Sequence, residues 1–504
     1  MTGWAGGKAC TSPSGKNEMP ANTLVVKDLL ELQSALAWAE RISMFAPLHQ
    51  KALRLYDSVT GRKILTRFEE LNRTQWLGRD ELLALQHTKL RRLVEYAYQY
   101  VPYYRRTFEQ VGFRPADLEK DPASFLKLPI VTKHDLREYA DEFLTTDPLL
   151  RKALHRHTTS GSTGEPLVFW EDGNYRDHVT ADILRHLTWC GWRLGEPHAY
   201  LWGQSVESHP LHQLRASLMD LTLNRFVANA YILSEQNLSA LVRQIRQRHP
   251  RLIFGYASAL CAFAQFVRDK QLSDIRFDAI YSGGEVLYAR QRQLLEATFD
   301  CRVFDRYGTL EVGGIACECG QHAGMHISVE SCCVEVLQNG APARDDQPGE
   351  IVVTNLNNYG FPFIRYHLAD VVQQRSQPCS CGRQSPMLDH VQGRVVDIFR
   401  TVDGRVVWGD LEGTVFEVEG IKQSQVIQKA LDLVVIRIVK DKTFDEARLA
   451  KIERVVKKIM GEAIRVQFEF PDHIAPLESG KFRYAYSELA RSHPTESLAE
   501  QADR

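Results

Sequence analysis

The chain has 504 residues and a formal net charge of -1, with 62 Lys and Arg against 63 Asp and Glu. This balance excludes a broad basic surface for nucleic acid. No apolar run reaches the roughly 18 residues of a membrane span, so no transmembrane segment is expected. Residues 1–20 lack a signal-peptide core, so the ten cysteines are expected to be reduced thiols in a cytoplasmic protein.

The length predicts more than one hydrophobic core. Residues 1–24 are rich in Gly, Ser and Pro and are expected to form a disordered leader before a large domain over residues 25–393. Within that domain, residues 80–99 predict a helix that Asp80 caps and that ends before Pro102.

Apolar strand candidates alternate with helices between about residues 155 and 390. The segments 251–255, 279–284 and 350–354 are typical of strands, whereas 257–267 is typical of a buried helix. This alternation predicts an α/β domain with a mainly parallel sheet.

The carboxyl-terminal part predicts a separate small unit. Residues 433–440 and 464–470 predict strands, and residues 445–460 predict an amphipathic helix between them. We therefore expect a small α+β domain over residues 394–490, followed by a tail over residues 491–504.

The segment HTTSGSTGEP (157–166) concentrates hydroxyl groups and glycines. Glycine allows a close backbone approach, and hydroxyl and N–H groups together can surround phosphate oxygens. A polar surface turn is the alternative. The expected phosphate contacts are Thr159, Ser160, Gly161, Ser162, Thr163 and Gly164.

Two further segments follow predicted strands. In YSGGEVL (281–287), a chain reversal would turn backbone groups toward a ligand, although an ordinary turn explains it equally well. In DRYGTLEVGG (305–314), Tyr307 could stack on a base and Glu311 could hold Mg²⁺ beside nucleotide phosphates. The alternative for Glu311 is a solvated side chain after a turn.

The last two segments each offer one charged side chain. In FPFIRYHLADVV (361–372), Asp370 could accept bonds from two ribose hydroxyls, or it could pair with Arg365 or His367. In LESGKFRYAY (477–486), Lys481 could deliver a cation to a reacting carboxylate or phosphate. An exposed loop lysine is the alternative.

In this order, the segments resemble the adenylate-forming superfamily, and more narrowly its phenylacetate–CoA ligase branch, which includes proteins of capsular polysaccharide biosynthesis. The resemblance spans about residues 80–490, and GRVVD (393–397) is similar to the hinge. It departs from the common pattern at Glu165, where many members have Lys. It departs again at His367 and Ala369, where the familiar form is R-Y-R-T-G-D.

The resemblance implies a large domain with mixed sheets flanked by helices and a small lid domain. It implies that Lys481 and Glu311 are catalytic, with Glu311 supporting Mg²⁺. The positions it implies for ATP in addition to the phosphate loop are Gly283, Gly284, Glu285, Tyr307, Gly308, Thr309, Asp370 and Arg394, with Asp397 as the hinge.

Six of the ten cysteines lie between residues 317 and 381. Cys319, His326, Cys379 and Cys381 would make a Cys₃His set, which suits structural Zn²⁺ and is similar to the zinc site of that branch. Cys317 and His322 are substitute ligands. Reduced cysteines that pack as small apolar residues are the alternative, expected in any case for Cys190, Cys261, Cys301, Cys332 and Cys333.

The expected function is activation of a small carboxylic acid by ATP, followed by acyl transfer to coenzyme A. An amine or carrier acceptor, as in polysaccharide biosynthesis, is the first alternative. A non-catalytic, zinc-stapled nucleotide-binding protein is the second alternative. A zinc hydrolase is the third, but the sequence lacks the H-E-x-x-H arrangement that such an enzyme could use. A homodimer is left open as an assembly.

Overall fold

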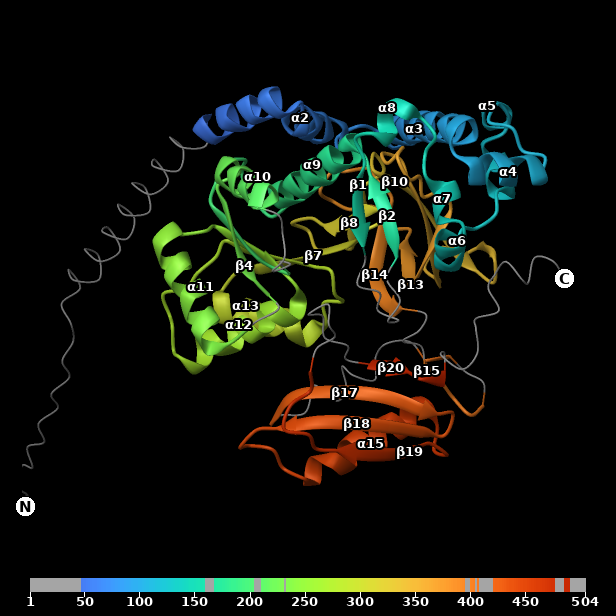
Figure 1. Cartoon of the computed structure of the whole chain (residues 1–504). Coiled ribbons are helices and arrows are strands. Elements are labelled where there is room, and N and C mark those ends of the chain that lie inside the picture. The colour runs from blue at the N-terminus through green and yellow to red at the C-terminus, as the bar shows by residue number, and fades with distance from the viewer. Residues whose placement is uncertain are drawn as a thin grey trace, which may run out of the picture.

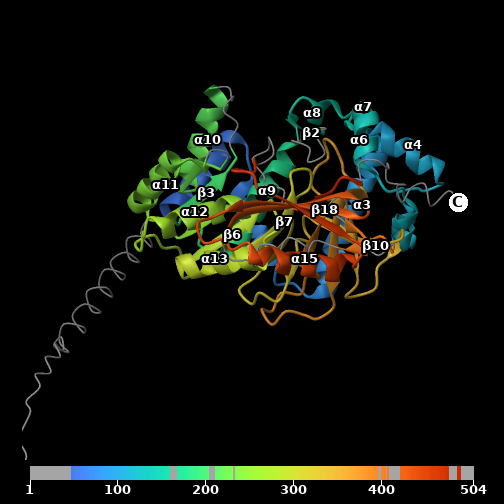
Figure 2. The same cartoon turned by 90° about the horizontal axis from the view of Figure 1, so that it is seen from below.

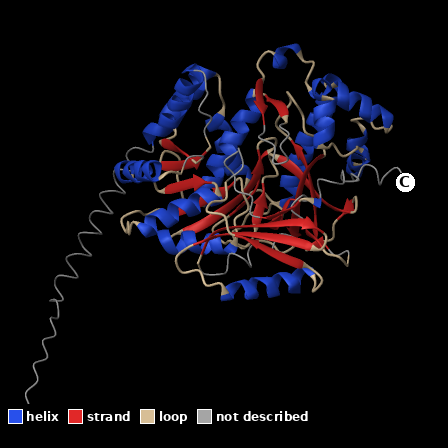
Figure 3. Ribbon diagram, turned by 60° about the horizontal axis from the view of Figure 1, so that its bottom comes forward, coloured by secondary structure: helices blue, strands red, loops and turns tan. Residues whose placement is uncertain are grey.

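The computed structural model describes residues 47–158, 167–203, 210–230, 233–394, 399–403, 406–407, 420–475 and 485–489 (Figure 1). Helices surround the strands in Figure 3, as expected for a mixed α/β chain. None of the described helices combines the length and apolar character that a membrane span requires.

Helices dominate the described chain before β1, starting with one over residues 47–60. They lie along the top of the molecule in Figure 1. The others are α2 (Ile64–Thr74), α3 (Arg79–Tyr100), α4 (Pro102–Gln110), α5 (Asp117–Lys120), a 3₁₀ helix (Pro122–Lys127), α6 (Lys133–Glu138), α7 (Ala140–Phe143) and α8 (Pro148–Arg151).

The predicted helix at residues 80–99 is confirmed as α3, but its predicted cap is wrong. The N-cap residue is Gly78, and Asp80 lies in the first turn. The carboxylate of Glu81 accepts the Gly78 N–H at 2.9 Å, so the glutamate satisfies an amide that the helix leaves unpaired.

Twelve described strands form one large sheet in the order β11–β10–β12–β13–β14–β9–β8–β7–β6–β5–β3–β4. A separate hairpin contains β1 (His155–Thr158) and β2 (Val168–Glu171). The twelve strands are β3 (His198–Trp202), β4 (Arg225–Asn229), β5 (Leu252–Gly255), β6 (Ala279–Gly283), β7 (Arg302–Thr309), β8 (Gly313–Glu318), β9 (Met325–Ile327), β10 (Cys332–Gln338), β11 (Ala341–Pro342), β12 (Pro348–Asn355), β13 (Tyr366–Arg375) and β14 (Met387–Arg394).

Helices cover both faces of the part of this sheet that contains β3 to β7. Phe254 of β5 packs in a core shared with Leu71 of α2 and Leu184 of α9. The adjacent Ile253 packs in a second core with Phe263 of α12. The covering helices are α9 (Gly173–Trp189), α10 (Pro210–Thr222), α11 (Glu235–Arg248), α12 (Ala257–Asp269) and α13 (Ala289–Phe299).

The prediction of a mainly parallel sheet is correct only for β4, β3, β5, β6 and β7. From β7 to β11 every neighbouring pair is antiparallel. The helical crossovers that parallel strands need stop after α13, and β7 joins β8 through a short turn. The sheet is therefore mixed.

The carboxyl-terminal unit has four described strands in the order β19–β18–β17–β20 and one helix. Its predicted β-α-β order is confirmed, because β18 and β19 are parallel and α15 connects them. In Figure 1 this unit lies below β13 and β14, and in Figure 2 it lies in front of the large body. Its elements are β17 (Ile421–Ala430), β18 (Leu433–Lys440), α15 (Ala447–Met460), β19 (Arg465–Glu469) and β20 (Ala485–Ser487), with β15 (Phe399–Arg400) and β16 (Val406–Val407) forming a second small sheet.

The predicted amphipathic face of α15 is also confirmed. Ile452 and Val456 are buried against the small sheet, and Leu449 and Ile459 are partly buried there. The helix begins at Ala447, two residues after the predicted start.

Candidate functional site

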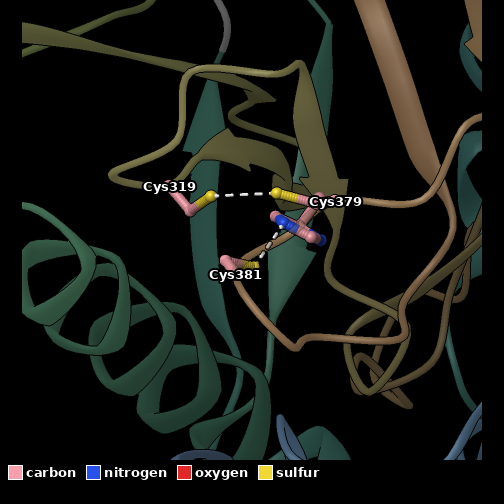
Figure 4. Close-up of side chains that lie close together, drawn as sticks. Cys319, Cys379 and Cys381 are labelled. Atoms are coloured by element: carbon pink, nitrogen blue, oxygen red, sulfur yellow. Dashed lines mark hydrogen bonds between the residues drawn. The ribbon is translucent and has the colours of Figure 1, made fainter.

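The structure brings together the four predicted metal ligands. One ligand atom from each of Cys319, His326, Cys379 and Cys381 lies within 4.8 Å of the other three. The sulfur atoms of Cys319 and Cys379 are 3.6 Å apart, and Cys381 Sγ is 3.2 Å from His326 Nε2. Figure 4 shows the three labelled cysteines turned toward a common centre.

Strand pairing explains why these four residues meet. His326 lies in β9, which pairs with β8 just before Cys319 and with β14 just after the Cys379–Cys381 loop. Gly324 has φ +124°, and a Cβ there would lie 2.8 Å from the Leu388 carbonyl oxygen. Only glycine therefore allows this close approach of two strands.

Residues next to the ligands orient them. The Arg383 N–H donates to Cys381 Sγ at 3.4 Å, and His326 Nδ1 lies 3.2 Å from Ser385 Oγ. The second contact leaves Nε2 of His326 facing the sulfur atoms, which is the usual arrangement around a metal-bound histidine.

Burial and hydrogen bonds shift the pKa values of the side chains in the cluster. Burial lowers the pKa of His326 to about 4, so its imidazole is neutral and can act as a ligand. Burial also raises the pKa of Cys319 to about 12. Burial opposes ionisation of Cys381 as well, but N–H donation from Arg383 holds its pKa below the ordinary value. Three sulfur atoms and one imidazole fit tetrahedral zinc.

The two substitute ligands lie outside this cluster. Cys317 is fully buried, and its sulfur donates to the Glu318 carbonyl oxygen at 3.3 Å. His322 Nδ1 lies 3.3 Å from Glu318 Oε2. The structure therefore selects Cys319 and His326 from the two pairs that the sequence left open.

The cysteines expected to act as small apolar residues do so where they are described. Cys190 and Cys332 are fully within the core, and Cys261, Cys301 and Cys333 are partly exposed. Burial raises the pKa of all five thiols, which disfavours the reactive thiolate.

Two residues of the predicted nucleotide site are in direct contact. The Tyr307 hydroxyl donates to Asp370 Oδ2 at 2.7 Å, and both side chains are buried. Tyr307 lies in β7 and Asp370 in β13, with β8, β9 and β14 between them in sheet order. The sheet therefore bends enough to bring two of its distant strands together.

Gly283 is the last residue of β6, and Gly284 follows it. Gly284 has φ +80°, and a Cβ there would lie 2.9 Å from the Tyr256 ring and 3.1 Å from the Trp202 ring. These two rings stack at 4.1 Å. Glu285 accepts the N–H and hydroxyl of Ser258 at 2.8 and 3.0 Å, which anchors it at the start of α12.

The turn between β7 and β8 carries Thr309 and Glu311. Thr309 Oγ1 accepts the Val312 N–H at 3.2 Å, and the Glu311 carbonyl oxygen accepts from Asn355 at 3.3 Å. A Cβ at Gly308 would lie 2.3 Å from the Gly313 carbonyl oxygen. The tight turn therefore requires glycine at this position.

The segment before Asp370 has two residues with positive φ, Arg365 at +48° and Ala369 at +58°. Left-handed backbone is unfavourable for alanine, so Ala369 adopts it at a cost of about 1–2 kcal/mol. Arg365 pairs with Glu335, and His367 pairs with Glu350. The two partners that the sequence suggested for Asp370 thus form ion pairs elsewhere.

Several predicted residues lie outside the described part of the chain. These are Thr159, Ser160, Gly161, Ser162, Thr163, Gly164, Asp397 and Lys481. The backbone of Arg394 is described, and it pairs with Asp370 between β14 and β13.

No pattern in the sequence predicts the buried ionic network beside β7 and β8. Arg185 of α9 pairs with Asp182 at 2.5 Å and with Glu330 at 3.0 Å, and all three side chains are almost fully buried. Charged residues in a helix are usually exposed, so no sequence signal marks such a network.

Comparisons with known proteins agree on the relationships of this chain. A family model described as the CapK C-terminal domain matches residues 399–488. The phenylacetate-coenzyme A ligase of Thermus thermophilus is 28% identical over 335 residues, which are 64% of this chain and 72% of that protein. The Escherichia coli enzyme of the same name is 27% identical over 332 residues, 63% of this chain and 72% of that protein.

Solved structures share the fold. A 2-hydroxyisobutyryl-CoA ligase in its postadenylation state, with R3-HIB-AMP, has a TM-score of 0.69 and 21% identity, covering 85% of this chain and 94% of that chain. The same ligase in its thioesterification state, with 2-HIB-AMP and CoA, has a TM-score of 0.56 and 20% identity, with the same coverage of both chains.

Proposed function

We propose that this chain, which is similar to phenylacetate–CoA ligases and shares the fold of a solved CoA ligase, activates a carboxylic acid with ATP and transfers the acyl group to coenzyme A. The fold, the order of the six sequence segments and the named relatives support the same reaction class.

The hydrogen bond between Tyr307 and Asp370 is the single observation that carries the proposal. It joins the segment proposed to stack on adenine to the segment proposed to hold the ribose. Both are polar groups in a buried environment, where a fixed arrangement strengthens each hydrogen bond. An adenosine group placed there would contact both residues.

In the first step, a carboxylate oxygen attacks the α-phosphorus of ATP. A P–O bond forms, the bond to the bridging β-phosphate oxygen breaks, and pyrophosphate leaves. Negative charge develops on the phosphate oxygens, and cations and N–H donors stabilise it. We assign this role to Lys481 and to the segment 159–164, with Glu311 as the ligand for Mg²⁺.

In the second step, the thiol of coenzyme A loses its proton and attacks the carbonyl carbon of the acyl-adenylate. A C–S bond forms and AMP leaves with the oxygen that joined it to the acyl group. Exclusion of water protects the acyl-adenylate from hydrolysis between the steps. The small domain over residues 394–490 and the hinge at Asp397 would provide that closure.

Zinc would be held by Cys319, His326, Cys379 and Cys381 as a closed, four-ligand structural site. Four protein ligands leave no open position for a substrate, so the metal would contribute folding free energy. The bound zinc would hold β8, β9 and the loop before β14 together.

The test is release of pyrophosphate in the presence of ATP and Mg²⁺, measured against a panel of aryl, fatty and hydroxy acids. We expect release that depends on one class of acid, and faster turnover when coenzyme A is added. Acid-dependent release that coenzyme A does not stimulate would favour an amine or carrier acceptor. ATP binding without release for any acid would overturn the proposal in favour of a non-catalytic nucleotide-binding protein.

A further inference from the structure

Helix α9 lies directly against the β7–β8 turn that carries Tyr307 and Glu311. The Tyr175 hydroxyl donates to the Leu310 carbonyl oxygen at 3.0 Å. One helical turn later, Val179 faces Gly313, where a Cβ would lie 2.9 Å from its side chain. The next turn of the same helix face presents Asp182 to Gly314.

Two oppositely charged side chains occupy the space beside a pair of glycines. Gly308 of β7 and Gly314 of β8 are paired across the turn. A Cβ at Gly314 would lie 2.1 Å from Asp182 Oδ2 and 3.0 Å from Arg306 Nη2. A Cβ at Gly308 would lie 3.0 Å from Arg306 Nη1. The absence of two side chains therefore makes room for the guanidinium group.

The Asp182 carboxylate is held firmly on its other side. Its Oδ1 accepts from Arg185 at 2.5 Å and from Ser328 at 3.3 Å. Arg185 also pairs with Glu330, which accepts the Thr74 hydroxyl at 2.7 Å. Asp182 Oδ2 has no hydrogen-bond partner among the described residues, and it occupies the space where a side chain at Gly314 would lie.

A buried ionic group is retained at a cost, because its desolvation is not fully offset by pairing. Asp182 and Arg185 are 1% and 2% exposed, and Arg306 is 9% exposed. Apolar side chains at these positions would fill the same core without that penalty. Because the network lies against Gly314 of β8, its charges can help to hold the β7–β8 turn in place.

We propose that Asp182 is a positioning residue for nucleotide binding, which packs against Gly314 and thereby holds β8 and the turn that carries Glu311 in register with Tyr307 of β7. This inference rests on the proposed function, because it assigns Asp182 to the ATP site of that reaction. Asp182 acts through Gly314 and its strand pairing with β7.

The first test is direct ATP binding, by titration calorimetry, to wild type, Asp182→Asn and Gly314→Ala. The amide would remove the negative charge beside Gly314, and the added methyl would occupy the carboxylate's space. We expect each variant to bind ATP at least about tenfold more weakly, because a shifted turn would misplace the residues proposed to hold the nucleotide. The Gly173→Ala variant, on the same helix but with nothing within 4 Å of the new Cβ, should bind as wild type does.

The double variant Asp182→Ala/Gly314→Ala separates positioning from general destabilisation. Removal of the carboxylate makes room for the methyl, so we expect ATP binding no weaker than in Asp182→Ala alone. In steady-state assays, KM for ATP should rise while KM for the acid stays unchanged. If Asp182→Asn does not fold, Gly314→Ala decides the question by the same readouts.

Folded variants of Asp182 and Gly314 that bind ATP as tightly as wild type would overturn the positioning role and leave the proposed function intact. A wild-type protein that binds no ATP and releases no pyrophosphate would overturn the proposed function and this inference with it.

Discussion

The metal cluster and the nucleotide region lie on the same sheet but are built in different ways. The cluster needs only four side chains from β9 and two neighbouring loops, and the described residues complete it. The region proposed for the nucleotide combines buried side chains such as Tyr307 and Asp370 with glycine backbone. The other segments proposed for it, residues 159–164 and Lys481, lie outside the described residues. The cluster is thus a local arrangement of four side chains, whereas the nucleotide site would be assembled from separate segments.

Loss of the metal should have the largest effect. We expect one zinc per chain by elemental analysis, and we expect Cys379→Ser to lower the free energy of unfolding by at least about 4 kcal/mol. Trp189 lies 5.8 Å from the His326 ring, so removal of zinc by a chelator should also change its fluorescence. Cys301→Ser, a partly buried cysteine outside the cluster, is the control. If the protein contains no zinc, or if the two variants are equally stable, the cluster is not a metal site that stabilises the fold.

Substitution of Lys481 tests the residue that we propose as the cation of the nucleotide region. Lys481→Ala should lower the rate of acid-dependent pyrophosphate release by about 10²–10³ if Lys481 is the cation that stabilises the reacting phosphate, as we propose. The metal content and thermal stability should not change. Lys451→Ala, an exposed lysine of α15 in the same small unit, is the matched control. Equal rates for both variants would assign the catalytic cation to another residue.

Substitutions of Tyr307 separate the contribution of its hydroxyl from that of its ring. Tyr307→Phe keeps the ring but loses the bond to Asp370, so KM for ATP should rise about tenfold. Tyr307→Ala loses both and should raise KM for ATP further. If the phenylalanine variant has the wild-type KM, the Tyr307–Asp370 bond contributes to folding only.

The smallest expected effect concerns the strained alanine before Asp370. Ala369→Gly should stabilise the protein by about 1 kcal/mol or less, because glycine adopts φ +58° without strain. Ala84→Gly, at an exposed position within α3, should instead destabilise it by about 1 kcal/mol. Chemical denaturation measures both. Destabilisation by both substitutions would show that Ala369 is not strained.

The sequence predicted much of this architecture. Apolar periodicity located α12, α15 and β18, and residue chemistry with the family resemblance predicted the four members of the cluster, with Cys317 and His322 as substitutes. The choice between Cys317 and Cys319 depended on the structure, because the sequence does not show that β8 ends at Glu318 and that Cys319 therefore lies in the loop beyond it. Periodicity could not separate parallel from antiparallel pairing beyond β7, since that depends on how the strands are connected.

The nucleotide region was only partly predictable. The order of the segments predicted that Tyr307 and Asp370 belong to one site, but nothing in the sequence predicts that their side chains bond to each other. Asp182 and Arg185 gave no signal, because a charged helical residue is usually exposed. Long-range packing of the bent sheet determines both features.

The central claim is that this chain forms an acyl-adenylate, and ATP–pyrophosphate exchange tests it most directly. Labelled pyrophosphate and ATP would be incubated with the protein and each acid, without coenzyme A. Reversible adenylation predicts label in ATP only when a suitable acid is present, and loss of the signal in Lys481→Ala. Binding of ATP with no exchange for any acid would contradict the account.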